Sequence, residues 1–297
     1  MIIVTGANGV FGRLVAERLL ELVPAGEVAV SVRAPDRADG LAARGVAVRR
    51  ADFADARTLP DAFSGADTVF VNGTYYGAAP AVRGPQLRGA VAAAVAAGAR
   101  RVVVTGWPDA ERSTLPSTAD FAETEAAVRG SAASWTIVRV GYGLAAALAR
   151  DVLAARRDGV LTAPAGDARL AVAGTEDQAE ATARVLAEST AGGDRARGRH
   201  DSRTYELRGP DAIGWAELAE LAGPGIEYRP EPEDAFRAHA VAKGFPAAAA
   251  DQLLALYASI RAGWANTPTV DLATLLGRPA VTARAAVVAA VQSWSWG

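Results

Sequence analysis

The chain has 297 residues, 51% of them hydrophobic, and its 31 basic and 33 acidic side chains give a formal net charge of −2. This balance is typical of a folded globular protein, and the charge gives no basis for nucleic-acid binding. The chain has no cysteine, which excludes disulfides and thiolate chemistry. It has two histidines, and we predict no metal site.

The first half of the chain alternates short apolar runs with helical patterns, which is typical of βαβ units and a parallel sheet. Runs such as VFV and RVVV are continuously apolar, as expected for parallel strands that are buried on both faces. We predict six strands, at residues 2–5, 28–32, 47–50, 68–72, 101–105 and 135–140. Helices are predicted between them at 11–22, 36–44, 58–63, 85–97 and 120–129.

The rhythm changes after about residue 143, and helical patterns dominate the second half. These patterns predict one strand at 204–207 and helices at 144–157, 176–188, 215–221, 234–243, 247–262 and 283–293. The predicted fold class is α/β, a doubly wound parallel sheet (Rossmann fold) over residues 1–143. Residues 144–297 are predicted to form a smaller, mostly helical lobe, of a kind that closes a cleft over the strand ends.

The stretch TGANGVFG stands between the first strand and the first helix. Gly6 allows a tight turn, Gly9 lets a phosphate approach the backbone, and Gly12 lets the helix pack on the strand. A pyrophosphate would rest on the positive N-terminus of the helix. A tight turn without a ligand is the alternative, but the flanking strand and helix favour a dinucleotide site. The cofactor contacts predicted in this loop are Gly6, Asn8, Gly9, Val10, Phe11 and Gly12.

The end of the second strand indicates which dinucleotide is bound. The strand runs into Arg33, and an arginine at this place suits the 2′-phosphate of NADP, whereas an acidic residue holds the ribose of NAD. Asp36 is the nearest acid and falls where a helix cap is useful. A solvated surface arginine is the alternative interpretation of Arg33. We predict NADP(H) as the cofactor.

The carboxyl ends of the later strands line the same crevice in a doubly wound sheet. An ordinary loop position is an equally good interpretation of each residue found there. The further cofactor contacts that we predict at these strand ends are Asp52, Phe53, Asn72, Gly73, Thr74 and Thr105.

Four stretches, TGANGVFG, SVRAPDRA, VRRADFAD and FAETEAAVRGSAASWTIVRVG, resemble the atypical short-chain dehydrogenase/reductases of the NmrA-like family. Within that family, the chain is most similar to the type 2 NADPH-dependent quinone oxidoreductases and the triphenylmethane reductases. The similarity continues, with less specific motifs, through nearly the whole chain. It implies NADPH in the strand crevice of a Rossmann domain and an acceptor pocket beside a smaller C-terminal lobe.

Ordinary short-chain dehydrogenases move a proton to a carbonyl with a Tyr-x-x-x-Lys pair and a serine. Phe121 stands here in place of the tyrosine, Glu125 in place of the lysine, and Gly106 in place of the serine. The quinone reductases of the family also lack this relay, so the resemblance implies NADPH-dependent reduction of a quinone-like acceptor. We assign no catalytic residue. Family members often carry an asparagine beside Gly141, where this chain has Val140.

Aromatic residues follow three of the predicted strands, and a quinone needs flat apolar walls. We predict a substrate pocket walled by Tyr75, Tyr76, Trp107 and Tyr142, with rim or core aromatics as the alternative. Trp264 is a candidate to approach from the C-terminal lobe. Glu123 and Glu125 are expected on a solvated helix face.

A second function remains open, because the family includes regulators that bind NAD(P) without turning it over. A reductase of a secondary metabolite is a third. The expected partner is a small-molecule acceptor, with no nucleic acid and no membrane, and a homodimer is left open. No apolar run reaches the length of about 18 residues that a membrane span needs, and residue 1 already belongs to a strand pattern. We therefore predict a cytoplasmic protein.

Overall fold

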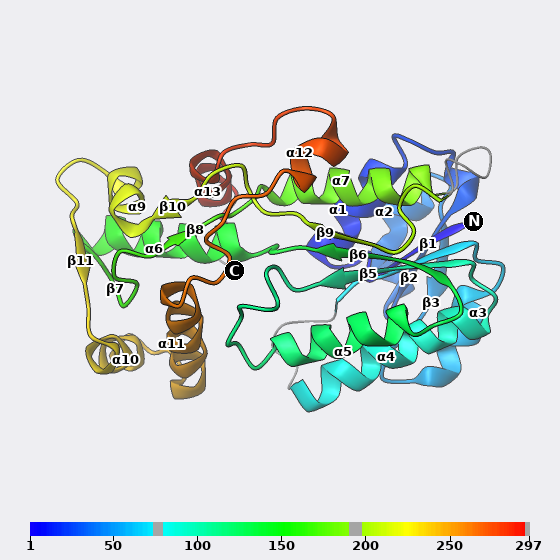
Figure 1. Cartoon of the computed structure of the whole chain (residues 1–297), viewed down its shortest axis with the longest axis horizontal. Coiled ribbons are helices and arrows are strands. Elements are labelled where there is room, and N and C mark those ends of the chain that lie inside the picture. The colour runs from blue at the N-terminus through cyan, green and yellow to red at the C-terminus, as the bar shows by residue number, and fades with distance from the viewer. Residues whose placement is uncertain (74–79, 190–197, 295–297) are drawn as a thin grey trace.

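The computed structural model describes residues 1–73, 80–189 and 198–294 of the chain (Figure 1). Seven parallel strands form one sheet in the order β3-β2-β1-β4-β5-β6-β9. The strands are β1 (Ile2–Thr5), β2 (Val28–Val32), β3 (Ala47–Arg50), β4 (Thr68–Val71), β5 (Arg101–Gly106), β6 (Ser134–Arg139) and β9 (Arg203–Glu206). Helices cover both faces of the sheet, so the predicted α/β class with a doubly wound parallel sheet is confirmed.

The inner strands are buried on both faces, which explains their continuous apolar runs. Every residue of β1, β2, β4 and β5 is buried. The strand order reverses between β1 and β4, and in open α/β sheets the ligand crevice lies at such a switch point, outside the carboxyl ends of the strands. The backbone N–H of Asn72 ties the two strand ends together by donating to Thr5 Oγ1 over 2.9 Å.

Two layers of helices flank the sheet. On one face α1 (Val10–Leu19) packs beside α7 (Thr175–Glu188), and on the other α4 (Pro80–Ala96) packs beside α5 (Thr118–Arg129). Each layer buries its apolar side chains in a cluster with the strands. The shorter elements of this half are η1 (Ala25–Glu27), η2 (Pro35–Ala38), α2 (Asp39–Ala42), η3 (Ala56–Thr58), α3 (Leu59–Phe63) and α12 (Asp271–Leu276).

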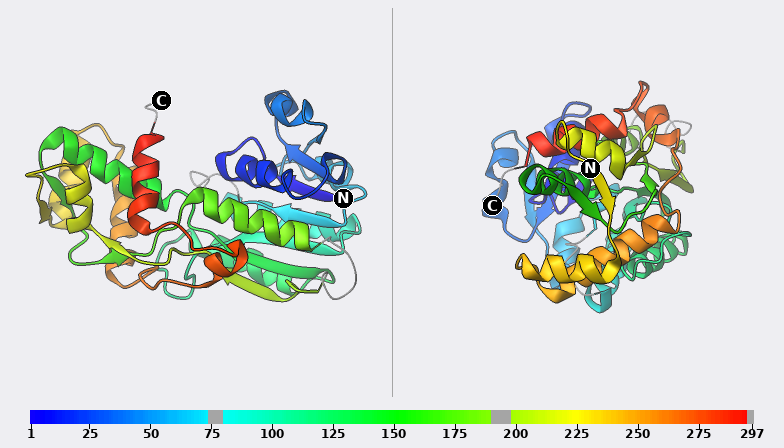
Figure 2. Two further views of the ribbon diagram at one scale, coloured as in Figure 1. Left: turned by 90° about the horizontal axis from the view of Figure 1, so that it is seen from above. Right: turned by 90° about the vertical axis from the view of Figure 1, so that its left-hand side faces the viewer.

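Most of the later helices gather at one end of the molecule, at the left of Figure 1, and give it the elongated outline of Figure 2. They are α6 (Leu144–Asp158), α9 (Trp215–Ala222), α10 (Glu233–Ala242), α11 (Ala247–Arg261) and α13 (Ala283–Gln292). Two small sheets join them, β7 (Leu161–Ala163) with β11 (Tyr228–Pro230), and β8 (Arg169–Leu170) with β10 (Ile213–Gly214). An apolar cluster lies among these elements. The predicted helical C-terminal region is confirmed, because most of its elements are helices.

The chain passes between the two ends of the molecule more than once. Both α7 and β9 follow residue 143, yet α7 packs on α1 and β9 pairs with β6 in the main sheet. The division into 1–143 and 144–297 stays a prediction, and some of the second range belongs to the sheet layers. In the part of the chain that the structure describes, none of the helices combines the length and the apolar character that crossing a membrane requires.

Candidate functional site

The glycine loop between β1 and α1 depends on glycine at two of its three spaced positions. Gly6 has a φ of +70°, in the left-handed region that favours glycine. A Cβ added to Gly12 would overlap the carbonyl oxygen of Gly6 and lie 2.8 Å from its carbon. Gly9 has an ordinary extended backbone, and a Cβ there would make a 3.4 Å contact. Nothing in the chain itself therefore requires glycine at position 9, and close approach of a phosphate stays its predicted role.

The N-terminus of α1 fits an anion. Among the residues that the structure describes, no side chain caps α1 at Gly9, and the first turn of the helix contains no acidic residue, so the positive helix end is left for an anion. Asn8 Nδ2 donates to the carbonyl oxygen of Ala34 over 2.7 Å. The other end of this amide, Asn8 Oδ1, is buried without a hydrogen-bond partner among the described residues. A helix start without a side-chain cap, a glycine cradle and an unpartnered acceptor together fit the pyrophosphate and ribose of a dinucleotide.

Basic residues surround the turn that follows β2. Arg33 is exposed at the strand end, and Arg13 of α1 donates from Nη2 to the backbone oxygen of Arg37 over 3.2 Å. Asp36 lies inside η2 rather than at its cap, which is Ala34, so its expected capping role is wrong. An exposed basic turn beside the glycine loop suits the 2′-phosphate of NADP, and the contact from Arg33 stays a prediction.

A pocket opens at the carboxyl ends of β4, β5 and β6, beside the glycine loop. Its lining residues are Asn72, Gly73, Thr105, Gly106, Phe121, Val140 and Tyr142. A Cβ added to Gly6 or to Gly12 would lie within 3.4 Å of Asn72 Nδ2. The pocket therefore lies against the glycine loop. Thr105 Oγ1 accepts from the N–H of Gly73 over 2.7 Å and fixes the turn after β4.

The ring of Tyr142 links the pocket to the glycine loop. It stacks on Phe11 with ring centroids 5.4 Å apart and an interplanar angle of 18°. Burial raises the pKa of the Tyr142 phenol, so the hydroxyl stays protonated at neutral pH. The structure thus brings together Phe11, Asn72, Gly73, Thr105 and Tyr142, five of the residues that the sequence placed in the site.

The remaining predicted site residues lie elsewhere or outside the described residues. Asp52 and Phe53 form a local turn after β3, where the N–H of Asp52 donates to Thr58 Oγ1 over 2.9 Å and Phe53 packs on a core cluster. Their predicted contact with adenine stays a prediction. Val10 is exposed at the start of α1. The predicted contacts Thr74, Tyr75 and Tyr76 fall outside the described residues.

Trp107 lies behind the pocket rather than in its lining. Its ring stacks on Phe121 at 5.4 Å between centroids, and Phe121 faces the pocket. On the other side Trp107 stacks on Trp264 at 5.6 Å and 6°, so the approach of Trp264 from the C-terminal half is observed. A direct contact between Trp107 and a substrate stays a prediction.

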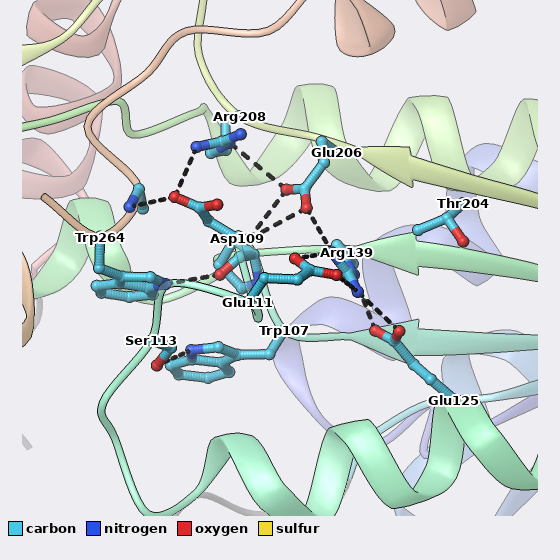
Figure 3. A network of polar contacts seen from close by, with 12 residues as sticks. Trp107, Asp109, Glu111, Ser113, Glu125, Arg139, Thr204, Glu206, Arg208 and Trp264 are labelled. Atoms are coloured by element: carbon cyan, nitrogen blue, oxygen red, sulfur yellow. Dashed lines mark hydrogen bonds and ion pairs between the residues drawn. The ribbon is translucent and has the colours of Figure 1, made fainter.

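An ion-pair network replaces the expected solvated face of α5. Glu123 is exposed and pairs with Arg88, but Glu125 is 1% exposed, so the expectation was wrong for Glu125. The reason is Arg139, which leaves the next strand β6 and donates from Nε and Nη2 to both carboxylate oxygens of Glu125, each over 2.9 Å (Figure 3). The spacing along α5 alone could not reveal a partner on another element.

Arg139 is the centre of this network, because it also bonds Glu111 over 2.7 Å and Glu206 over 2.9 Å. Burial opposes the charge of Arg139, yet the hydrogen bonds that it donates to Glu125, Glu111 and Glu206 raise its pKa overall. The hydrogen bond from Arg139 lowers the pKa of Glu111, whereas burial raises the pKa of Glu206. The network therefore holds a cation permanently behind the pocket.

Gly106 has no room for a side chain beside this network. A Cβ added there would overlap the carboxylate of Glu125 and lie 2.8 Å from Arg139 Cγ. Glu125 cannot withdraw without losing its hydrogen bonds to Arg139 and Arg129. The residue types at positions 106 and 125 are thus coupled by a direct contact.

The model of the NAD(P)H-binding family matches residues 6–188, from the glycine loop to the end of α7. The chain belongs to the NAD(P)H-binding family. Quinone oxidoreductase 2 of Escherichia coli is 33% identical over 289 residues, which cover 95% of this chain and 96% of that protein. The crystal structure of NADPH-dependent quinone oxidoreductase QOR2 from Escherichia coli with NADPH has a TM-score of 0.87 and 31% identity, covering 97% of this chain and 99% of that one. Triphenylmethane reductase of a Citrobacter species has a TM-score of 0.88 and 27% identity, covering 98% and 99%.

These similarities confirm the family resemblance drawn from the sequence. The sequence predicted only part of the pocket lining. Gly106 and Phe121 were considered only as replacements of a proton relay, and Val140 only as a departure from the family pattern. A signal was available for Phe121, because it lies on the first turns of the helix that follows β5 and is the only aromatic residue of that helix.

Proposed function

We propose that this protein reduces quinone-like acceptors with NADPH, without a tyrosine–lysine–serine proton relay. The oxidoreductase class and the NADP(H) cofactor, both predicted from the sequence, are confirmed by the family and by relatives that are named as NADPH-dependent quinone oxidoreductases. The quinone acceptor is the finer part of the proposal. The observation that carries it is the pocket beside the glycine loop, which has two aromatic residues, Phe121 and Tyr142, in its described lining.

The residues at the relay positions support this choice of acceptor. A ring without a hydroxyl stands at position 121, and the carboxylate of Glu125 accepts hydrogen bonds from Arg139 and Arg129 instead of facing an acceptor. A simple ketone becomes an alkoxide on reduction, which needs an adjacent acid or another oxyanion stabiliser. A quinone gives a delocalised anion that takes its protons from water.

Each group of the chain has a limited part in this reaction. When bound, NADPH supplies the hydride. The glycine loop and the first turn of α1 would hold its phosphates, and the rings of Phe121 and Tyr142 would orient a flat acceptor and keep water away. Two of the described residues that line the pocket, Thr105 and Tyr142, carry hydroxyls. Thr105 is engaged by the N–H of Gly73, and Tyr142 has a raised pKa because it is buried.

The test is NADPH oxidation over a panel of small quinones, aliphatic ketones and imines, with NADH alongside. We expect turnover with quinones and none with aliphatic ketones. Tyr142→Phe should leave the quinone rate within about twofold, since no proton is assigned to its hydroxyl. Tyr142→Ala should raise the acceptor KM, because it removes a wall of the pocket.

Two outcomes would contradict the proposal. Efficient ketone reduction that is lost in Tyr142→Phe would make Tyr142 a proton donor. Tight NADPH binding without turnover of any acceptor would instead favour the nucleotide sensor.

A further inference from the structure

One group of contacts joins the segment after α11 to the segment after β5, beside the pocket. We call these residues, Trp107, Pro108, Asp109, Trp264 and Ala265, the joint. The first three follow β5, and the last two follow α11. Trp264 is 0% exposed and Ala265 is 1% exposed, so the joint is part of the protein interior.

The joint is closed by stacking and by two hydrogen bonds. Trp264 Nε1 donates to the carbonyl oxygen of Pro108 over 2.6 Å, while its ring lies parallel to that of Trp107. The N–H of Ala265 donates to Asp109 Oδ2 over 3.0 Å. Figure 3 shows the ring of Trp264 beside Trp107, and the side chain of Asp109 directed toward Arg208.

Both residues of the second hydrogen bond have unfavourable backbone conformations. Asp109 has a φ of +48° and Ala265 a φ of +52°, and the described residues contain one other non-glycine residue of this kind, Ser202. Such conformations cost free energy and persist where the surroundings impose them, often at functional sites. Two of these three residues meet at one contact. The surrounding structure therefore holds the joint in place despite the free-energy cost of these backbone conformations.

Charged residues of the network fix Asp109 from the sheet side. The N–H of Asp109 donates to both oxygens of Glu206, over 3.1 and 3.2 Å. Its carboxylate also pairs with Arg208 over 3.3 Å. Glu206 in turn bonds Arg139, so the joint and the ion-pair network form one continuous support.

This support ends at the pocket. Trp107, clamped by Trp264, stacks on Phe121, and Phe121 lines the pocket. The guanidinium carbon of Arg83 lies over the same ring, 5.7 Å from its centroid. The position of the Phe121 ring is therefore determined on one face by residues from the distant half of the chain.

We propose that Asp109 and Trp264 are positioning residues that hold the Phe121 wall and so determine which flat acceptors fit the pocket. This inference rests on the proposed function, because it assigns the acceptor side of the same pocket. The joint lies behind Phe121, whereas the glycine loop lies beside Asn72 and Tyr142. Disturbing the joint changes acceptor binding and leaves NADPH binding intact.

The test variant is Asp109→Gly, which removes the carboxylate while glycine accepts the φ of +48°. We expect the KM for a small benzoquinone to rise about three- to tenfold, with kcat and the NADPH dissociation constant within about twofold of wild type. Ser202→Gly is the matched control, since it relieves the third such backbone away from the joint and changes none of these values. Ala265→Gly keeps the N–H and also leaves the acceptor KM unchanged.

A second readout needs no turnover. The protein is labelled with 4-fluorophenylalanine, and the resonance that disappears in Phe121→Leu reports the Phe121 ring. This resonance shifts in Asp109→Gly, because Ala265 loses the hydrogen bond that anchors its neighbour Trp264 against Trp107, and it stays in place in Ser202→Gly. Trp264→Phe removes the Nε1 hydrogen bond and part of the ring that stacks on Trp107, and it serves as the test variant should Asp109→Gly not fold.

The two readouts separate the inference from the proposed function. If wild type turns over no quinone, the proposed function fails, and the Phe121 resonance alone decides whether the joint positions the ring. An unmoved resonance in folded Asp109→Gly overturns the inference. A moved resonance with an unchanged acceptor KM in an active enzyme also overturns it, because the ring would not govern acceptor fit.

Discussion

The two sides of the pocket are built by different means. The glycine loop forms its side from seven consecutive residues, 6–12, whose backbone supplies the geometry and whose side chains carry no charge. The Phe121 side is assembled from α5, the segment after β6, and the joint, which itself combines residues after β5 and after α11. A buried ion-pair network lies behind it. The first side is therefore sensitive to the volume of single atoms, and the second to charge and to contacts between distant segments.

Breaking the ion-pair network is expected to have the largest effect. Arg139→Met leaves the buried carboxylate of Glu125 without its main partner, and removing one member of such a pair costs about 3–5 kcal/mol. Urea unfolding measures the loss. Glu123→Gln, at the exposed pair with Arg88, is the control and should cost less than about 1 kcal/mol. Equal losses in the two variants would remove the distinction between the two sides.

The glycine loop is expected to respond next. A methyl group at Gly12 overlaps the backbone of Gly6, so Gly12→Ala should cost about 3 kcal/mol of stability and abolish NADPH binding. Gly9→Val should stay folded, because the backbone at Gly9 is ordinary, but should lose binding if a phosphate lies against it. Gly89→Ala, where the new methyl group meets nothing within 4 Å, is the control. Calorimetric titration with NADPH measures binding, and normal affinity in Gly9→Val would contradict the site.

The basic turn after β2 adds charge to the glycine-loop side of the pocket, where residues 6–12 carry none. It therefore tests whether charge matters on that side as well. Arg33→Glu should remove most of the preference for NADPH over NADH, because a charge-assisted hydrogen bond contributes about 1.5–3 kcal/mol, or roughly ten- to a hundredfold in affinity. Titration with both cofactors measures this. Equal affinities in wild type would make Arg33 a surface residue.

Lowering the pH is expected to have the smallest effect of these changes, and it should reduce the stability of the Phe121 side more than that of the glycine-loop side. The pKa of Glu111 is lowered in the folded protein, so its contact with Arg139 stabilises the fold above the ordinary value of 4.5 and is lost as the pH falls below it. Glu111 is largely exposed, and the contribution is less than about 1 kcal/mol. Unfolding midpoints at pH 6 and pH 3 should differ more in wild type than in Glu111→Gln.

Local patterns made the sheet side of the molecule predictable. The strands at 2–5, 28–32 and 47–50 were placed at their observed bounds, because apolar runs and the glycine loop act over a few residues. The pairing of β7 with β11 and of β8 with β10 was missed, since each strand has two or three residues and forms only when a distant segment arrives. The predicted helix at 36–44 became a 3₁₀ turn and a short helix.

The same physical difference explains the site. Asn72, Gly73 and Tyr142 follow strand ends, Thr105 lies near the end of β5, and Phe11 lies at the start of the helix after β1. The topology of a parallel sheet brings these strand ends together. The burial of Glu125 and the position of Trp264 behind Trp107 depend on which side chains meet across elements, and no spacing within one segment encodes that.

The contact between Gly106 and Glu125 also restricts how this chain can change by mutation. A serine at position 106 would push its Cβ into the carboxylate of Glu125. A lysine at position 125 would bury a second cation against Arg139 and Arg129. Either single substitution is costly, and the two together remove only the overlap with the carboxylate, since the added Cβ still lies 2.8 Å from Arg139 Cγ. A descendant of this chain would therefore acquire the serine and lysine of a carbonyl reductase only by crossing a poorly folded intermediate, or by first losing Arg139.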